Sequence, residues 1–173
     1  MSDPLAPVSI ATIQDGQSVA LRGDEALRQK IAQRLGLLSL SRFEADATLE
    51  RDGDTIAAKG TVRAELEQAC TATGDPIEER VDEPFSLRFA PQPEHGEDEE
   101  IELASDDLDT IFHDGRQIGL GDAIIDTLAL ALDPYPRVED ADERLRAAGV
   151  LTEEEAGAFG ALAELKKKME GGG

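Results

Sequence analysis

The residues best suited to chemistry lie in one short corner, 70–76, which reads Cys-Thr-Ala-Thr-Gly-Asp-Pro. Cys70 is the single cysteine of the chain, and a thiol becomes a nucleophile only when a neighbouring base or cation favours the thiolate. The two histidines, His95 and His113, stand in segments that we expect to be loops, and nothing in their spacing brings either to the corner. We therefore interpret Cys70 as a buried or half-buried small residue at a strand end.

Other candidates for chemistry are the acidic residues, and they give no specific signal. A lone cysteine excludes an intramolecular disulfide and a multi-cysteine zinc site. The acidic run between residues 91 and 102 lacks the alternating Asp/Asn ligands and the obligatory glycine placement of a calcium-binding EF-hand loop. Adjacent pairs such as Asp106-Asp107 would suggest a hydrolase, but with 38 acidic residues in the chain such pairs arise by chance. We predict no catalytic residue, no metal, no cofactor and no small-molecule substrate.

The net charge of −21 restricts the partners. A polyanion is repelled by phosphate backbones unless a basic face is segregated from the acids, so direct RNA binding is disfavoured and basic proteins are the better partners. The one basic cluster in the first half comprises Arg28, Lys30 and Arg34, which would share a helix face. It is a candidate RNA contact, although an ordinary solvated helix face is the commoner meaning of such a cluster.

The chain shows no membrane or export signal. Its N-terminus has neither a positive flank nor an apolar leader, and no run of about 18 apolar residues occurs. We expect a cytoplasmic protein without a membrane partner.

Alternation of apolar and polar residues predicts a hairpin over 43–66. Phe43 to Leu49 and Ile56 to Leu66 each alternate with period two, and Asp52-Gly53-Asp54 lies between them as a turn. A third antiparallel strand is expected over 77–89. Pro84 cannot donate to a ladder, so we expect it at an edge, at a bulge or where the N–H position faces outward, with the sheet interrupted there.

Two helices are expected to pack on this sheet. The first spans 24–35, with Asp24 as N-cap, Leu27 and Ile31 on its apolar face, and Gly36 where it stops. The second spans 120–132 and is largely buried, with Leu130 widening its apolar stripe. Asp133-Pro134 ends it, because a residue before proline is disfavoured in the helical region.

These elements predict an α+β fold, with an antiparallel sheet built on 43–66 and 77–89. Residues 1–137 would form a single domain that carries a mobile acidic loop over 91–102. Residues 138–173 would form a polar extension with a short amphipathic helix near 153–169, loosely attached to the domain.

Two segments are candidate partner sites. The helix near 153–169 presents Phe159, Leu162 and Leu165 on a narrow stripe. In the proline-rich segment 133–137, Tyr135 and Arg137 are residue types that often anchor interfaces. The alternative for this segment is a rigid strap that crosses the sheet and buries Tyr135, and the residues alone do not separate the two.

Several of these motifs together resemble the YceD family of large ribosomal RNA subunit accumulation proteins. The resemblance rests on the corner with Cys70, Thr73 and Pro76, on the segments 81–91 and 159–167, and on a motif before the polar extension. That motif consists of Asp133, Pro134, Tyr135, Pro136 and Arg137.

This chain departs from many of those relatives at one position. They carry Cys-x-x-Cys at the corner, and Thr73 stands here in place of the second cysteine. A metal or redox role of the paired form is therefore not carried over. A branch of the family with Thr at this position is similar in this respect.

The resemblance implies a non-enzymatic factor that supports accumulation of large-subunit (23S) ribosomal RNA in a bacterial cytoplasm. Together with the net charge, it favours contact through basic ribosomal or assembly proteins. The alternative is an acidic protein-binding adaptor unrelated to ribosome assembly.

Overall fold

The computed structural model describes residues 5–92, 109–150, 166 and 169. The chain divides into two compact units, which are described separately below. The first unit comprises Met1–Gln68 and Glu78–Pro134, and the second comprises Ala69–Ile77 and Tyr135–Gly173. The predicted domain boundary after residue 137 stays a prediction.

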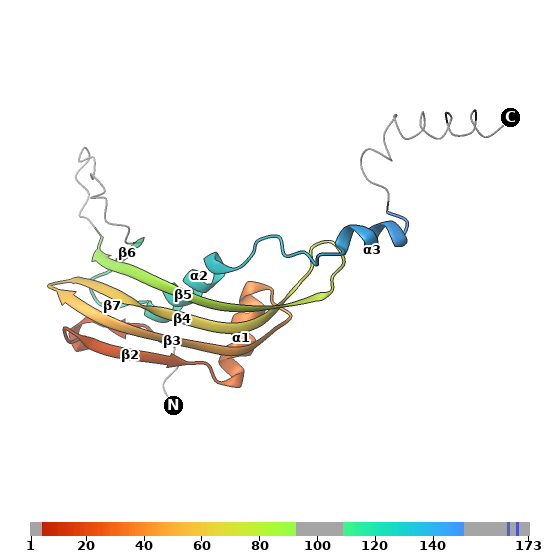
Figure 1. The fold of residues 1–173 in the computed structure, drawn as a ribbon. Helices are drawn as coiled ribbons and strands as arrows, with labels where there is room; N and C mark the ends of the chain where they lie inside the picture. The colour runs from red at the N-terminus through yellow and green to blue at the C-terminus, as the bar shows by residue number, and fades with distance from the viewer. Residues whose placement is uncertain (1–4, 93–108, 151–165, 167–168, 170–173) are drawn as a thin grey trace. The chain divides into compact units, whose positions relative to one another are not determined.

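The first unit is built on a five-stranded sheet with strand order β2-β3-β4-β5-β6 (Figure 1). A second, two-stranded sheet pairs β1 with β7 in antiparallel orientation. The α+β fold predicted from the sequence is confirmed. The strands are β1 (Val8–Ser9), β2 (Gln17–Arg22), β3 (Ser39–Asp52), β4 (Thr55–Ala69), β5 (Pro76–Pro91), β6 (Asp109–His113) and β7 (Gln117–Ile118).

The predicted hairpin is formed by β3 and β4. Its register pairs Phe43 with Ala64 and Ala45 with Val62, so the apolar residues of both strands share one face. All four of these side chains are buried. The two-residue turn contains Gly53 at φ 61°, a left-handed conformation that glycine adopts without a steric cost.

The predicted third strand is β5, and it runs without interruption from Pro76 to Pro91. The expectation that Pro84 breaks the sheet is wrong. Among the described residues, β6 pairs with β5 only from Leu87 to Pro91. Pro84 therefore lies where β5 is an edge strand, and an edge tolerates a residue without an N–H. The β5–β6 pairing is parallel, which makes the sheet mixed.

Helix α1 (Glu25–Leu35) begins and ends at the predicted residues. The Asp24 side chain accepts a hydrogen bond from the Leu27 backbone N–H at 2.8 Å, and Gly36 closes the helix in the left-handed region at φ 68°. Leu27 and Ile31 are buried, as their spacing predicts.

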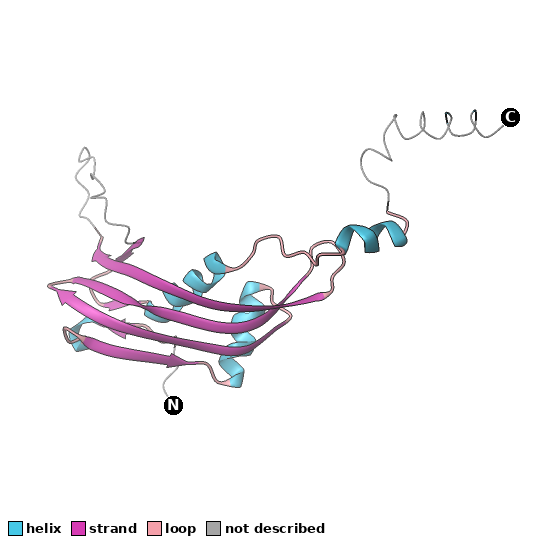
Figure 2. Cartoon of the chain, viewed as in Figure 1, coloured by secondary structure: helices cyan, strands magenta, loops and turns pink. Residues whose placement is uncertain are grey.

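Helix α2 (Leu120–Ala131) supplies the other half of the core. Buried residues of α1, α2 and one face of the sheet form a single apolar cluster, so both helices cover the same face (Figure 2). The prediction that Leu130 belongs to the buried apolar stripe of α2 is wrong, because the Leu130 side chain is 82% exposed. A short 3-10 helix, η1 (Ile10–Thr12), also contributes to this cluster.

The second unit contains α3 (Ala141–Ala147) and the corner between β4 and β5. Of the helix predicted near 153–169, the structure describes Lys166 and Met169, both helical. Phe159, Leu162 and Leu165 lie outside the described residues, as does most of the predicted acidic loop over 91–102.

Candidate functional site

The family-like corner is a closed, hydrogen-bonded turn. The Cys70 N–H donates to the Asp75 carbonyl at 2.7 Å, and the Gly74 N–H donates to the Cys70 carbonyl at 2.8 Å. Gly74 has φ 78°, a conformation that L side chains rarely adopt. The sequence Thr-Gly-Asp-Pro therefore folds back on itself through local hydrogen bonds, as its turn residues predict.

The Cys70 thiol lies inside this turn and is 3% exposed. Its pKa is lowered from 9.0 to about 7, chiefly by a hydrogen bond from the Thr73 hydroxyl and also by the backbone N–H groups of Val138, Thr73 and Ala72, while burial acts in the opposite direction. The Thr73 hydroxyl also lies 2.7 Å from Oδ2 of Asp75, to which it donates. One hydroxyl proton serves one acceptor at a time, so the backbone donors hold the thiolate whenever Thr73 turns to Asp75.

The described residues around this thiol do not form a metal site. No cluster of three or more His, Cys, Asp or Glu side chains suited to a metal ion occurs in the described part of the chain. His113 belongs to the first unit, and His95 is outside the described residues. Nε2 of His113 lies 2.8 Å from the Asp54 carbonyl, and its Nδ1 accepts from the Gly115 N–H at 2.9 Å. These two contacts occupy both ring nitrogens of His113 within the first unit.

The proline-rich segment is tied to the corner within the second unit. The Pro136 carbonyl accepts hydrogen bonds from the Thr71 N–H at 2.8 Å and from the Thr71 hydroxyl at 3.2 Å. Pro136 is buried, whereas the Tyr135 side chain is 76% exposed. The interpretation of this segment as a strap that buries Tyr135 is therefore wrong. Tyr135 as a partner contact stays a prediction.

Arg144 of α3 completes this arrangement, and the sequence did not point to it. Its guanidinium contacts Oδ2 of Asp75 at 2.6 Å and Oδ2 of Asp140 at 2.8 Å. The Thr73 hydroxyl and Arg144 together lower the pKa of Asp75 below its ordinary value. Arg137, a predicted partner residue, is paired with Asp142 at 2.8 Å. The i,i+4 spacing of Asp140 and Arg144 is a local signal, but the contact with Asp75 has none.

The predicted RNA-contact residues are largely engaged within the first unit. Arg34 bridges Asp122 and Asp126 of α2 at 2.7 and 2.8 Å. The Asp122 hydrogen bond is the largest of the effects that raise the pKa of Arg34. Arg28 donates to the Gly23 carbonyl at 2.9 Å, and Lys30 is exposed. Two of the three cations thus form bonds within the first unit, and an RNA contact by this helix stays a prediction.

The exposed face of the sheet is also charge-balanced. Arg22 and Arg63 both contact Asp46, at 2.6 and 3.2 Å, and Arg63 reaches Asp82 at 3.6 Å. These side chains form a ladder of alternating charge across β2, β3, β4 and β5. The ladder does not give the segregated basic face that phosphate binding would need.

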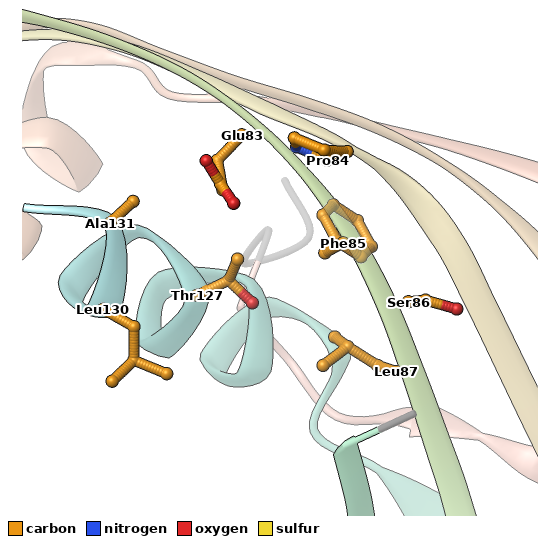
Figure 3. A pocket seen from close by; sticks show the side chains of 8 residues that line it. All are labelled: Glu83, Pro84, Phe85, Ser86, Leu87, Thr127, Leu130 and Ala131. Atoms are coloured by element: carbon orange, nitrogen blue, oxygen red, sulfur yellow. The ribbon is translucent and has the colours of Figure 1, made fainter. Parts of the chain in front are cut away.

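A groove that the sequence did not indicate lies between β5 and α2 (Figure 3). It encloses about 260 Å³, and Glu83 and Phe85 face Thr127 across it. No Lys or Arg is among the described residues that line it. Its lining comprises Glu83, Pro84, Phe85, Ser86, Leu87, Thr127, Leu130 and Ala131.

Comparison with known families finds a match over more than half of the chain. Residues 58–166 match the model of the family described as "Large ribosomal RNA subunit accumulation protein YceD". The match includes β4 from residue 58 onward, the corner, the groove and the segment 133–137. It begins after α1, so the cations of that helix lie outside it.

This chain therefore belongs to the YceD family. No curated protein and no solved structure matches the chain. None of the helices in the described ranges is long and apolar enough to cross a membrane.

Proposed function

We propose that this protein supports the accumulation of large-subunit (23S) ribosomal RNA as a non-enzymatic factor in the bacterial cytoplasm, acting through basic ribosomal or assembly proteins. The observation that carries the proposal is the family match over residues 58–166, because the family is described by the accumulation of large-subunit ribosomal RNA.

The charge distribution favours binding to basic proteins over direct binding to RNA. The chain has a net charge of −21. Arg28 and Arg34 are bonded within the first unit, and the exposed sheet face alternates acids with bases. A surface of this kind attracts basic protein segments and repels phosphates.

The proposal is tested by depleting the protein and measuring the ratio of large-subunit to small-subunit ribosomal RNA. The ratio is expected to fall, and re-expression of the unchanged chain is expected to restore it. An unchanged ratio after depletion would contradict the proposed function.

A second measurement separates an assembly factor from an adaptor outside ribosome assembly. The tagged protein is sedimented with ribosomal precursor fractions at several salt concentrations, and we expect it to travel with large-subunit precursors. Loss of this association at high salt would show an electrostatic contact. Recovery of the protein only outside these fractions, with an unrelated partner, would favour the adaptor.

A further inference from the structure

The groove between β5 and α2 combines a strand edge with a wall from a helix. One wall is the edge of β5 on the side away from β4, where, among the described residues, β6 pairs with the strand only from Leu87 onward. The other wall is the last turn of α2, where the Leu130 side chain is 82% exposed. An edge strand beside an apolar wall is a common place for a partner to add an extended segment.

The groove is bordered by hydrogen-bond acceptors and negative charge. The Glu83 carboxylate projects into it from β5 (Figure 3). Further along the same strand, Glu79 is half-buried, and burial together with the charge of Asp133 raises its pKa above the ordinary value. Burial and a neighbouring acid both disfavour the ionised carboxylate, and an incoming cation would offset both.

The last turn of α2, beside the groove, also lacks positive charge. It contains no basic residue, so the negative end of the helix dipole is not compensated there by the helix itself. A cation placed there is favoured by the dipole.

We propose that this groove binds an extended, lysine- or arginine-rich segment of a protein partner, with its apolar side chains against Phe85, Leu87 and Leu130 and its cations beside Glu79 and Glu83. Pro84 lacks an N–H and limits how many backbone hydrogen bonds such a segment forms with β5, so side-chain contacts carry the specificity. The inference deepens the proposed function and rests on it for the class of partner, namely basic ribosomal or assembly proteins.

The test uses the full chain and a fluorescent peptide of about ten residues in which lysine alternates with valine, a length that in extended form covers β5 from Glu79 to Leu87. We expect it to bind, and we expect a peptide with glutamate in place of lysine not to bind. The double variant Glu79→Gln/Glu83→Gln should weaken binding of the lysine peptide by about tenfold.

A matched control removes the same charge from the opposite face of the sheet. Asp82 neighbours Glu83 on β5 but contacts Arg63, and Glu50 contacts Lys59, so Asp82→Asn/Glu50→Gln leaves the groove intact. This control should change the affinity by less than about twofold. The variant Leu130→Ser, which keeps every charge, should also weaken binding, and thermal melting verifies that all variants are folded.

Three results would overturn the proposal. The first is failure of the lysine peptide to bind, and the second is an equal loss of peptide affinity in the groove double variant and in the control double variant. The third is peptide binding that begins only after Lys166, Lys167 and Lys168 are changed to Glu. The last would show that the chain's own lysine segment occupies the groove. Peptide binding is measured on purified protein, so an unchanged ribosomal RNA ratio alongside groove-specific binding would remove the proposed function alone.

Discussion

Thr73 has a definable role at the corner in place of the second cysteine of a Cys-x-x-Cys pair. Its hydroxyl serves two acidic neighbours, the Cys70 thiol and the Asp75 carboxylate, and it lowers the pKa of both. Asp75 is also held by Arg144. A hydrogen-bonded network thus connects the corner to α3 without a metal ligand set in the described residues.

The variant Thr73→Val should raise the pKa of Cys70 from about 7 toward its ordinary value of 9.0, because the hydroxyl donor is lost. The ultraviolet absorbance of the thiolate, followed against pH, measures this change. Thr71→Val is the control, since the Thr71 hydroxyl donates to the Pro136 carbonyl. A titration curve that Thr73→Val leaves unmoved would exclude Thr73 as the principal donor.

The depressed pKa of Cys70 also predicts a pH dependence of stability. The folded state favours the thiolate, so this contribution is fully present above the unfolded pKa of about 9 and is lost as pH falls through about 7. Chemical denaturation between these limits should show wild type gaining stability with rising pH relative to Cys70→Ala. Parallel pH profiles of the two proteins would contradict the assignment.

The contribution of Glu79 to stability should change with pH in the opposite direction to that of Cys70. Its folded pKa is raised, so the ionised carboxylate disfavours folding once pH rises through that pKa. Glu79→Gln is therefore expected to stabilise the chain at neutral pH by about 0.5 kcal/mol or less. The gain should vanish in acid, where Glu79 is protonated. Denaturant midpoints at neutral and acidic pH measure it, and a loss of stability at neutral pH would be the opposite of this expectation.

At the scale of elements, the β3–β4 pairing contains one position that admits only glycine. A Cβ added to Gly60 would overlap the Asp46 carbonyl oxygen and lie 2.9 Å from the Cα of Ala47. Both atoms belong to the backbone of the neighbouring strand, so neither can move without distorting the ladder. The close approach of β3 to β4 at this point depends on the missing side chain.

Gly60→Ala should therefore lower the free energy of unfolding by about 1–3 kcal/mol, the usual cost of overpacking a well-packed site. Thermal or denaturant unfolding measures the loss. Gly119→Ser is the control, because the nearest atom to an added Cβ there is 4.0 Å away and serine is a good N-cap. Equal stability of Gly60→Ala and wild type would show that the two strands can separate at this point.

The whole molecule is governed by its net charge of −21. Mutual repulsion among so many acids disfavours a compact chain, and dissolved salt screens that repulsion. The melting temperature should therefore rise between about 0.01 M and 0.15 M salt, as the Debye length falls from about 30 to 8 Å. A melting temperature that falls over this range would mean that the cross-strand ion pairs outweigh the net repulsion.

Much of the fold could be predicted from the sequence because it is encoded locally. The alternation of Phe43 to Leu66 identifies the buried face of the hairpin, and the Asp24 and Gly36 caps give the ends of α1. An edge position was among those expected for Pro84, but the expected interruption of the sheet was wrong, since the effect of a proline depends on whether a neighbouring strand requires its N–H. That neighbour, β6, lies beyond the acidic segment, and nothing in the spacing gives its register.

The sequence by itself determined the fold class, the hairpin, the caps of α1 and the family resemblance, since each depends on residues close together in the chain. Only the tertiary structure decided which distant groups meet. Arg144 contacts Asp75 across 69 residues, and Thr71 contacts Pro136 across 65. The walls of the groove likewise come from separate elements, β5 and α2. Such contacts depend on how whole elements pack together, so no local hydrophobic periodicity or motif predicts them.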